Sequence, residues 1–383
     1  MKKKIIITSN AYWPSIGGIE NSLRHLVLES KSMNDHVDVI VSDIGTPHFK
    51  QVEHIDGVNI FRYQLRPTNS SILNFIKSNI DAYNLFKAKF KKNPNSIIIA
   101  RFHLSVIYAH LVGFRNIKYL VPSIVRNQCN QEINNINLKQ KIKKKIWVLL
   151  HDFLQKKALK LSDVFVFSDT MKEQCNDLVD CLNIRITKPG VDTDRFYPDE
   201  IFLQQEREKY TISYNEKVIL FVGRFVQAKQ VDLLIKSFSL LREGKLILVG
   251  DGDEKNNLIQ LIYELNLNDR VIIIPPCRNV EDIYRIADVF VMSSSYEPLG
   301  QTIIEAFSSG LPVVAFRRSV LVNTATEELG MDDFIYYAED FTIDSLSMAL
   351  SKAIKNNLNR NLIHNTTKDK FSWNNLYLTL VGS

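Results

Sequence analysis

The stretch from Phe290 to Phe316 constrains the fold of this chain more than any other. It reads FVMSSSYEPLGQTIIEAFSSGLPVVAF, with a helical pattern between two uninterrupted apolar runs. Runs that are apolar on both faces are typical of parallel strands covered by helices, and Gly310 followed by Pro312 is a common helix stop. The sequence therefore predicts a strand, a helix and a second, parallel strand.

Two glutamates fall where this unit could bind a ligand. Glu297 is on the predicted loop after the first strand, and Glu305 is about one turn into a predicted helix that begins near Gly300. Ligands of open α/β sheets bind beyond the carboxyl ends of the strands, and a helix N-terminus offers free N–H groups to a phosphate. The two carboxylates could address different parts of one ligand, although a lone glutamate near a helix start more often only offsets the helix dipole.

Strand and helix patterns alternate on both sides of this unit. The segment KPGVDTDRFYPDE at 188–200 interrupts the alternation with proline, glycine and an acidic turn, as a linker does. The sequence predicts an α/β fold of two doubly wound, Rossmann-like domains at 1–188 and 189–365. The last stretch, 366–383, has a helical pattern and could pack back on the first domain.

Charge is distributed unevenly between the two halves. Residues 1–190 hold 28 Lys and Arg against 15 Asp and Glu, which is +13, and the remaining residues hold 20 against 27, which is −7. An anionic partner, such as a membrane surface or a phosphorylated acceptor, would explain the basic half. A well-solvated basic surface explains it equally well.

Length and cysteine pattern narrow the class of protein further. With 383 residues, of which 45% are apolar, the chain can form two ordinary cores, and it has no run of 18 apolar residues. The first apolar run is too short for a signal-peptide core. Because no long apolar run occurs, we expect a soluble or peripheral protein. Because the four cysteines lack metal-binding or redox spacing and a disulfide framework is implausible at this size, we expect a reducing, cytoplasmic setting. The cysteines are Cys129, Cys175, Cys181 and Cys277.

The segment 138–161 reads as a basic amphipathic helix. It carries eight lysines against a single acid, Asp152, and an apolar stripe with Trp147 at its polar edge. Such a helix can lie on anionic lipid. Burial of the stripe in the core, which a helix of an α/β domain usually requires, is the more common explanation.

Two cations follow the first strand predicted in the second domain. Arg224 and Lys229 lie in GRFVQAK, at the edge of the sheet where ligands bind, and a pair of cations suits a diphosphate. Taken alone, an arginine and a lysine in a loop are usually solvated surface charges. Their placement in the same domain as Glu297 and Glu305 favours a shared site.

These motifs together resemble a known enzyme family. The pattern S-x-x-E-P-L-G-Q-T-x-x-E-A is similar to the E-x7-E signature of family-four retaining glycosyltransferases, whose fold is GT-B, although the usual wording E-G-F-G is here E-P-L-G. Three more family motifs occur in order: GGIE at 17–20, PGVD at 189–192, and VGR at 222–224 with Lys229. The resemblance implies two Rossmann-like domains that face each other across a cleft.

The resemblance also implies a role for each matched residue. Arg224 and Lys229 would hold the diphosphate of a nucleotide-sugar and stabilise the leaving group, Glu305 would take the ribose hydroxyls, and Glu297 would contact the sugar. Gly17 and Gly18 would let the backbone approach the phosphates. Donor-binding backbone groups would come from Gly223, Leu299, Gly300, Gln301 and Thr302. Arg278, after another strand, would line the base pocket.

One departure from the family pattern concerns a histidine near the sugar. Where members commonly carry it, this chain has Arg126 and Asn127, and His103 at the end of an earlier strand is the nearest alternative. A lone histidine beside an apolar strand is more often a satisfied structural residue.

The resemblance implies a retaining hexosyltransferase that needs neither metal nor another cofactor. Asp192-Thr193-Asp194 lies in the predicted linker, and GDGDE at 250–254 is interpreted as a tight turn rather than a metal motif. The donor would be a nucleotide-sugar, with UDP as the expected carrier, and the acceptor a cell-envelope glycan (lipopolysaccharide, capsule or other polysaccharide) or a lipid-linked sugar. No nucleic-acid partner is expected, and the enzyme would act in the cytoplasm or on the inner face of the cytoplasmic membrane. A nucleotide-sugar epimerase or hydrolase and a non-catalytic nucleotide-sugar-binding protein are the alternatives.

Overall fold

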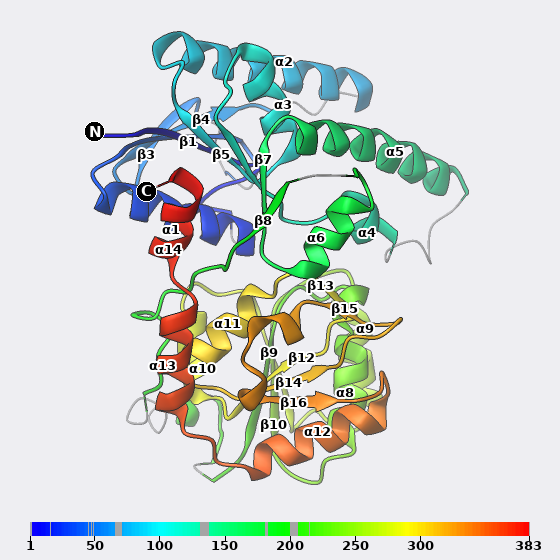
Figure 1. Cartoon of the computed structure of the whole chain (residues 1–383). Helices are drawn as coiled ribbons and strands as arrows, with labels where there is room; N and C mark the ends of the chain where they lie inside the picture. Colours follow the sequence, from blue (N-terminus) through cyan, green and yellow to red (C-terminus); the bar gives the residue numbers. More distant parts are fainter. Residues whose placement is uncertain are drawn as a thin grey trace. The chain divides into compact units, whose positions relative to one another are not determined.

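The computed structural model divides the chain into two compact units (Figure 1). Unit 1 is Met1–Gly190 with Trp373–Ser383, and unit 2 is Val191–Ser372. The sequence predicted that the first domain ends at residue 188, two residues before the end of the main part of unit 1. It also predicted a C-terminal segment that begins at residue 366, whereas the helix Arg360–Lys370 belongs to unit 2. The structure describes all residues except 1, 16, 45, 47, 49, 66–70, 131–137, 181–182, 200–205, 214 and 383, and leaves out the side chains of 71–76, 128–130, 138–140 and 144.

Unit 1 is a sheet covered by helices. Its central strands, such as IIIT and IIIA, are buried on both faces, as parallel strands between two helical layers must be. The described strands are β1 (Lys4–Thr8), β2 (His36–Ser42), β3 (Val52–Ile55), β4 (Val58–Tyr63), β5 (Ile97–Ala100), β6 (Ile117–Leu120), β7 (Asp163–Val166) and β8 (Ile184–Ile186). The helices are α1 (Gly18–Ser32), α2 (Ser71–Lys92), α3 (His103–Val112), α4 (Val125–Asn130), α5 (Leu138–Lys160), α6 (Asp169–Asn176) and α14 (Trp373–Val381).

The strand order of unit 1 is β3-β4-β2-β1-β5-β6-β7-β8, and only the β3–β4 pair is antiparallel among the described strands. The order reverses between β1 and β5, which is where a ligand crevice forms in such sheets. The C-terminal helix α14 packs on α1, where the Trp373 ring stacks on His25 with centroids 4.9 Å apart. The Tyr377 hydroxyl donates to Asp35 at 2.7 Å. The end of the chain is therefore part of unit 1.

Unit 2 repeats the same layering. Successive residues of its first strand face opposite cores, with Leu220 in one and Phe221 in the other. The described strands are β9 (Val218–Val222), β10 (Lys245–Val249), β11 (Val271–Ile274), β12 (Val289–Met292), β13 (Tyr296–Glu297), β14 (Val313–Phe316), β15 (Asn323–Thr324) and β16 (Ile335–Ala338). The helices are η1 (Gln227–Lys229), α8 (Val231–Ser239), α9 (Lys255–Glu264), α10 (Val280–Ile286), α11 (Gln301–Ser308), η2 (Thr326–Leu329), η3 (Asp332–Phe334), α12 (Ile343–Lys355) and α13 (Arg360–Lys370).

The main sheet of unit 2 is parallel, in the order β11-β10-β9-β12-β14-β16. Helices α8, α9 and α12 contribute to the core on one face, and α10, α11 and α13 to the core on the other. The predicted strand, helix and strand at 290–316 are β12, α11 and β14, so that prediction is confirmed. The order reverses between β9 and β12, which makes their carboxyl ends the expected ligand-binding edge.

Candidate active site

The loops after β9 and β12 are joined at the point where the strand order of unit 2 reverses. The Ser293 hydroxyl donates to the Lys229 carbonyl at 2.7 Å, and the Ser295 N–H donates to the Ala228 carbonyl at 2.9 Å. Both bonds hold η1 against the end of β12. The lysine predicted from one loop therefore reaches the glutamate predicted from the other.

Lys229 and Glu297 form an ion pair at the centre of this site. The Lys229 Nζ contacts Glu297 Oε2, while Glu297 Oε1 accepts the N–H of Gly300 at 3.0 Å. The side chains are 19% and 16% exposed, so water screens them only partly. Glu297 thus fixes the lysine and also holds the backbone of Gly300, the residue that precedes α11.

The sequence predicted Glu297 on a loop, but the residue lies in a short strand. It ends the two-residue strand β13, which pairs with β15 in parallel, with Glu297 opposite Thr324. Two residues are too few to show a strand period in the sequence. The pairing fixes the backbone that carries the carboxylate.

Gly300 is required by the geometry at the start of α11. Its φ is 74°, in the left-handed region, and a Cβ there would lie 3.1 Å from both Ile303 Cγ2 and Met292 Cε. Leu299 packs against the core, and Gln301 and Thr302 begin the helix. The first N–H groups of a helix have no partner within it, so this end can bind an anion.

Glu305 faces the protein interior on the next turn of α11. It is 8% exposed, and its Oε2 lies 3.2 Å from the Tyr284 hydroxyl, which is also 3.2 Å from the Thr302 carbonyl. Burial raises the pKa of Glu305 to about 7, while the Tyr284 hydrogen bond and the charge of Arg195 act against that rise. Glu305 is therefore a buried carboxylate whose charge depends on its neighbours.

Arg195 and Tyr284 are residues that the sequence reasoning missed. Arg195 lies in the segment read only as a linker, and its guanidinium contacts Glu281 at 2.6 Å and the carbonyl of Arg278. Arg285 in turn donates to the Arg195 carbonyl at 2.7 Å. The PGVD motif just before Arg195 could have indicated that this segment borders the site. For Tyr284 the sequence shows only an apolar position of α10.

The other predicted cations of unit 2 are exposed. Arg224 follows Gly223 at the end of β9, and within the described part of the chain its side chain makes no hydrogen bond or ion pair. Arg278 lies after β11, at the edge of the sheet, and meets Arg195 through its carbonyl. Arg224 is therefore exposed and available to a ligand at this edge. The role of Arg278 in binding the base stays a prediction.

The glycines predicted to approach phosphates lie in unit 1, between β1 and α1. Gly17 precedes α1 with extended backbone, and a Cβ on it would lie 2.3 Å from the Glu20 carboxylate. The space beside Gly17 is thus occupied by Glu20. Gly18, the first residue of α1, is exposed.

His103 is paired with a second histidine inside unit 1. It begins α3, is 4% exposed, and its Nε2 lies 2.8 Å from Nδ1 of His151. Burial and the neighbouring His151 lower the pKa of His103 to about 3, so the ring is neutral. These contacts favour a structural role for His103 over a place in the site. Arg126, the other residue considered in place of the family histidine, lies on α4. Its charge lowers the pKa of Asp152 and so opposes the effect of burial on that carboxylate.

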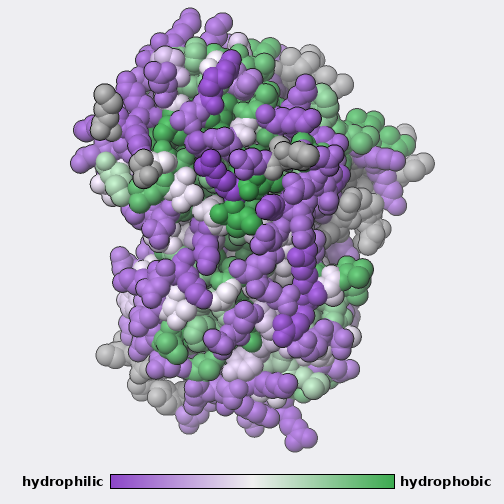
Figure 2. Space-filling view, viewed as in Figure 1, coloured by the Kyte–Doolittle hydropathy of each residue, from purple (hydrophilic) through white to green (hydrophobic). Residues whose placement is uncertain are grey.

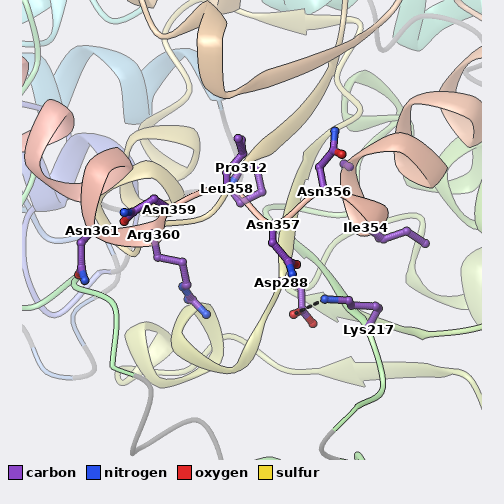
Figure 3. A pocket seen from close by; sticks show the side chains of 11 residues that line it. Lys217, Asp288, Pro312, Ile354, Asn356, Asn357, Leu358, Asn359, Arg360 and Asn361 are labelled. Carbon is purple, nitrogen blue, oxygen red and sulfur yellow. Dashed lines mark ion pairs between the residues drawn. The ribbon is translucent and has the colours of Figure 1, made fainter.

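A hollow of about 450 Å³ in unit 2 lies away from this site. It is lined by Lys217, Asp288 and Pro312, which directly precede β9, β12 and β14, and by the segment after α12 (Figure 3). Those are the amino ends of the strands, opposite the edge that carries Lys229. Asp288 is engaged there by Arg207 at 2.7 Å and by Lys217 at 3.6 Å.

Two features are absent from the part of the chain that the structure describes. The described residues contain no cluster of three or more His, Cys, Asp or Glu side chains placed to hold a metal ion. They also contain no helix with the length and apolar character needed to cross a membrane.

The architecture is that of the GT-B fold. Sucrose-phosphate synthase from Thermosynechococcus elongatus matches with a TM-score of 0.79 and 20% identity over 99% of this chain and 98% of that one. Anabaena HepE in complex with UDP-glucose matches with a TM-score of 0.72 and 14% identity over 99% and 98%. At these identities the two structures show the fold alone.

Sequence comparison shows which proteins this chain is similar to. Residues 203–369 match the family of group 1 glycosyl transferases. Mannosylfructose-phosphate synthase of Agrobacterium fabrum is 33% identical over 188 residues, 45% of this chain but only 40% of that relative. An uncharacterized glycosyltransferase of Methanocaldococcus jannaschii is 25% identical over 97% of this chain and 95% of its own length. The chain is thus similar in sequence to glycosyltransferases, and the family match covers less than half of it.

Proposed function

We propose that the chain is a retaining glycosyltransferase that takes a sugar from a nucleotide-sugar, with UDP as the expected carrier. The observation that carries this proposal is the cluster of Lys229, Glu297 and the start of α11 at the point where the strand order of unit 2 reverses. A cation, a carboxylate and free helix N–H groups suit a diphosphate with a hydroxylated sugar beside it.

In this proposal the chain acts chiefly by stabilising the leaving group. The bond between the anomeric carbon and the diphosphate oxygen breaks, the acceptor oxygen bonds to that carbon on the same face, and the acceptor proton goes to the leaving diphosphate. Arg224 and Lys229 balance the negative charge that develops, which is the contribution with the largest typical effect on rate. Glu297 orients the sugar and Glu305 accepts the ribose hydroxyls.

The proposal also covers the metal requirement, the acceptor and the location of the enzyme. Transfer needs no metal ion, because the two cations take the role that a metal would otherwise have. The acceptor is a cell-envelope glycan, such as lipopolysaccharide or capsule, or a lipid-linked sugar. The enzyme works from the cytoplasm, at the inner face of the membrane.

Two experiments test this function. A panel of nucleotide-sugars is first screened for a rise in melting temperature, since a ligand that binds only the native state stabilises it. The selected donor is then supplied with acceptors, and the anomeric configuration of the product is read by NMR. An inverted product would contradict the retaining mechanism.

A nucleotide-sugar hydrolase or epimerase and a non-catalytic binding protein make different predictions in the same assay. Release of free sugar, or isomerised donor, without acceptor would favour the first. Donor binding with no turnover on any acceptor would favour the second. The presence of all four matched residues, Arg224, Lys229, Glu297 and Glu305, favours transfer over a non-catalytic role.

A further inference from the structure

Helix α5 presents an apolar stripe on its outer side. Five residues share it, and each is exposed, with Ile146 at 62%, Leu149 at 60% and Phe153 at 56%. They fall within an arc of about 100° around a helix with 3.6 residues per turn. Figure 2 shows hydrophobic residues gathered in the region of α5 and bordered by hydrophilic ones. The outer stripe consists of Ile142, Ile146, Leu149, Leu150 and Phe153.

The core of unit 1 is contacted by the opposite side of the same helix. His151, Gln155, Ala158 and Leu159 are buried, and Gln155 donates to the Ser123 carbonyl at 2.8 Å. These positions lie roughly half a turn away from the outer stripe. Burial in the core therefore does not account for the stripe, although core packing was the more common explanation for such a sequence.

Lysines surround the outer stripe. Lys143 and Lys145 flank it on its two sides, and Lys156, Lys157 and Lys160 continue the basic character toward the end of the helix. All five are exposed. Apolar side chains between lysines are the pattern by which a helix lies in the interface of an anionic bilayer.

Trp147 borders the outer stripe beside the buried histidines. The residue is 47% exposed, and its ring lies 4.0 Å from that of His151, centroid to centroid. A half-exposed tryptophan is favoured at the level of lipid headgroups, where its apolar ring and its N–H are both satisfied. The indole also provides an optical signal for contact with lipid.

We infer that the outer stripe of α5, with its flanking lysines, binds the surface of an anionic lipid bilayer without crossing it. A second copy of the chain is the less suitable occupant, because two such surfaces would bring their lysines together. Anionic headgroups instead complement the lysines while the acyl region takes the apolar side chains. The inference rests on unit 1 alone and holds whether or not the chemistry proposed for unit 2 is correct.

Vesicle sedimentation with the full chain tests this inference. Wild-type protein is expected to bind vesicles of phosphatidylglycerol and phosphatidylcholine in equal parts, to bind phosphatidylcholine alone far more weakly, and to dissociate as salt is raised. The Trp147 emission should shift to the blue only with the mixed vesicles, and Trp147→Phe should remove that shift.

Two sets of variants assign the binding to α5. Combined Ile142→Ser, Ile146→Ser, Leu149→Ser and Phe153→Ser should abolish binding. Combined Lys141→Gln, Lys143→Gln and Lys145→Gln should weaken binding on the order of 100-fold. The matched controls change exposed residues of unit 2: Val320, Leu321, Ile259 and Tyr263 to serine, or Lys352, Lys355 and Lys368 to glutamine.

The melting temperature of each variant checks that it folds. Equal binding to neutral and anionic vesicles, or undiminished binding of the serine variant, would overturn the inference. So would a wild-type dimer that fails to bind vesicles and that the serine variant converts to a monomer, because the occupant would then be a second copy.

Discussion

Replacing Tyr284 with phenylalanine removes one hydroxyl from the candidate site and leaves the buried ring in place. That hydroxyl lies 3.2 Å from Glu305 Oε2 on a ring that is fully buried between Phe196 and Phe290. The charged groups acting on Glu305 are Arg195, which favours its ionised form, and Glu281, which opposes it. The substitution therefore acts on the charge of Glu305 more than on packing.

The size of the effect follows from the hydrogen bond. A bond to a charged group contributes about 1.5–3 kcal/mol, and one pKa unit corresponds to about 1.4 kcal/mol. Losing it should raise the pKa of Glu305 from about 7 by a further one to two units. If the carboxylate form binds the ribose, donor affinity at neutral pH should fall about 5- to 50-fold.

The assay is calorimetric titration of the nucleoside diphosphate across pH. Wild-type affinity should rise as pH increases through about 7, because Glu305 then loses its proton, and should level off above it. In Tyr284→Phe the rise should be displaced to higher pH, and the two proteins should converge in alkali. Tyr337→Phe is the control, since it removes a similar 2.9 Å bond to Asp332 in the same unit. An unchanged midpoint in Tyr284→Phe would refute the reasoning.

Three further substitutions follow from the structure. Lys229→Ala should keep the fold while slowing transfer on the order of 100- to 1,000-fold in a radiolabelled-donor assay, and near-normal turnover would remove its assignment. Gly300→Ala should destabilise unit 2 by about 1–2 kcal/mol in urea unfolding, because φ is 74° and the added Cβ meets Ile303 and Met292; an unchanged midpoint would contradict this. Trp373→Ala should cost about 3–5 kcal/mol through the lost packing of α14 on α1, measured the same way, and wild-type stability would show that α14 contributes little.

The strand and helix alternation was predictable because its physical cause is local. Strands such as VILFV and VFVM are apolar on both faces, and helix-length segments separate them. That pattern alone leads to parallel, doubly wound sheets, and their connections place Lys229 and Glu297 at one edge. The contact between these two side chains was not predictable, since it depends on η1 bonding to Ser293 and on the short pairing of β13 with β15.

Features that depend on the direction in which a side chain points could not be predicted from the sequence. The period of α5 reveals apolar residues but not that Ile146 and Phe153 point away from the core. Likewise, nothing local to Tyr284 indicates that its hydroxyl meets Glu305 from another helix. His103 shows the reverse case, because a plausible site position turns out to be bonded to His151 in the interior.

The central claim is that a nucleotide-sugar binds at the edge of unit 2 marked by Arg224 and Lys229. The most direct measurement is calorimetric titration of UDP into the wild type, into combined Arg224→Ala and Lys229→Ala, and into Lys217→Ala at the opposite edge. The account predicts binding to the wild type and to Lys217→Ala, and little or none to the double variant. Equal affinity in all three proteins would contradict it.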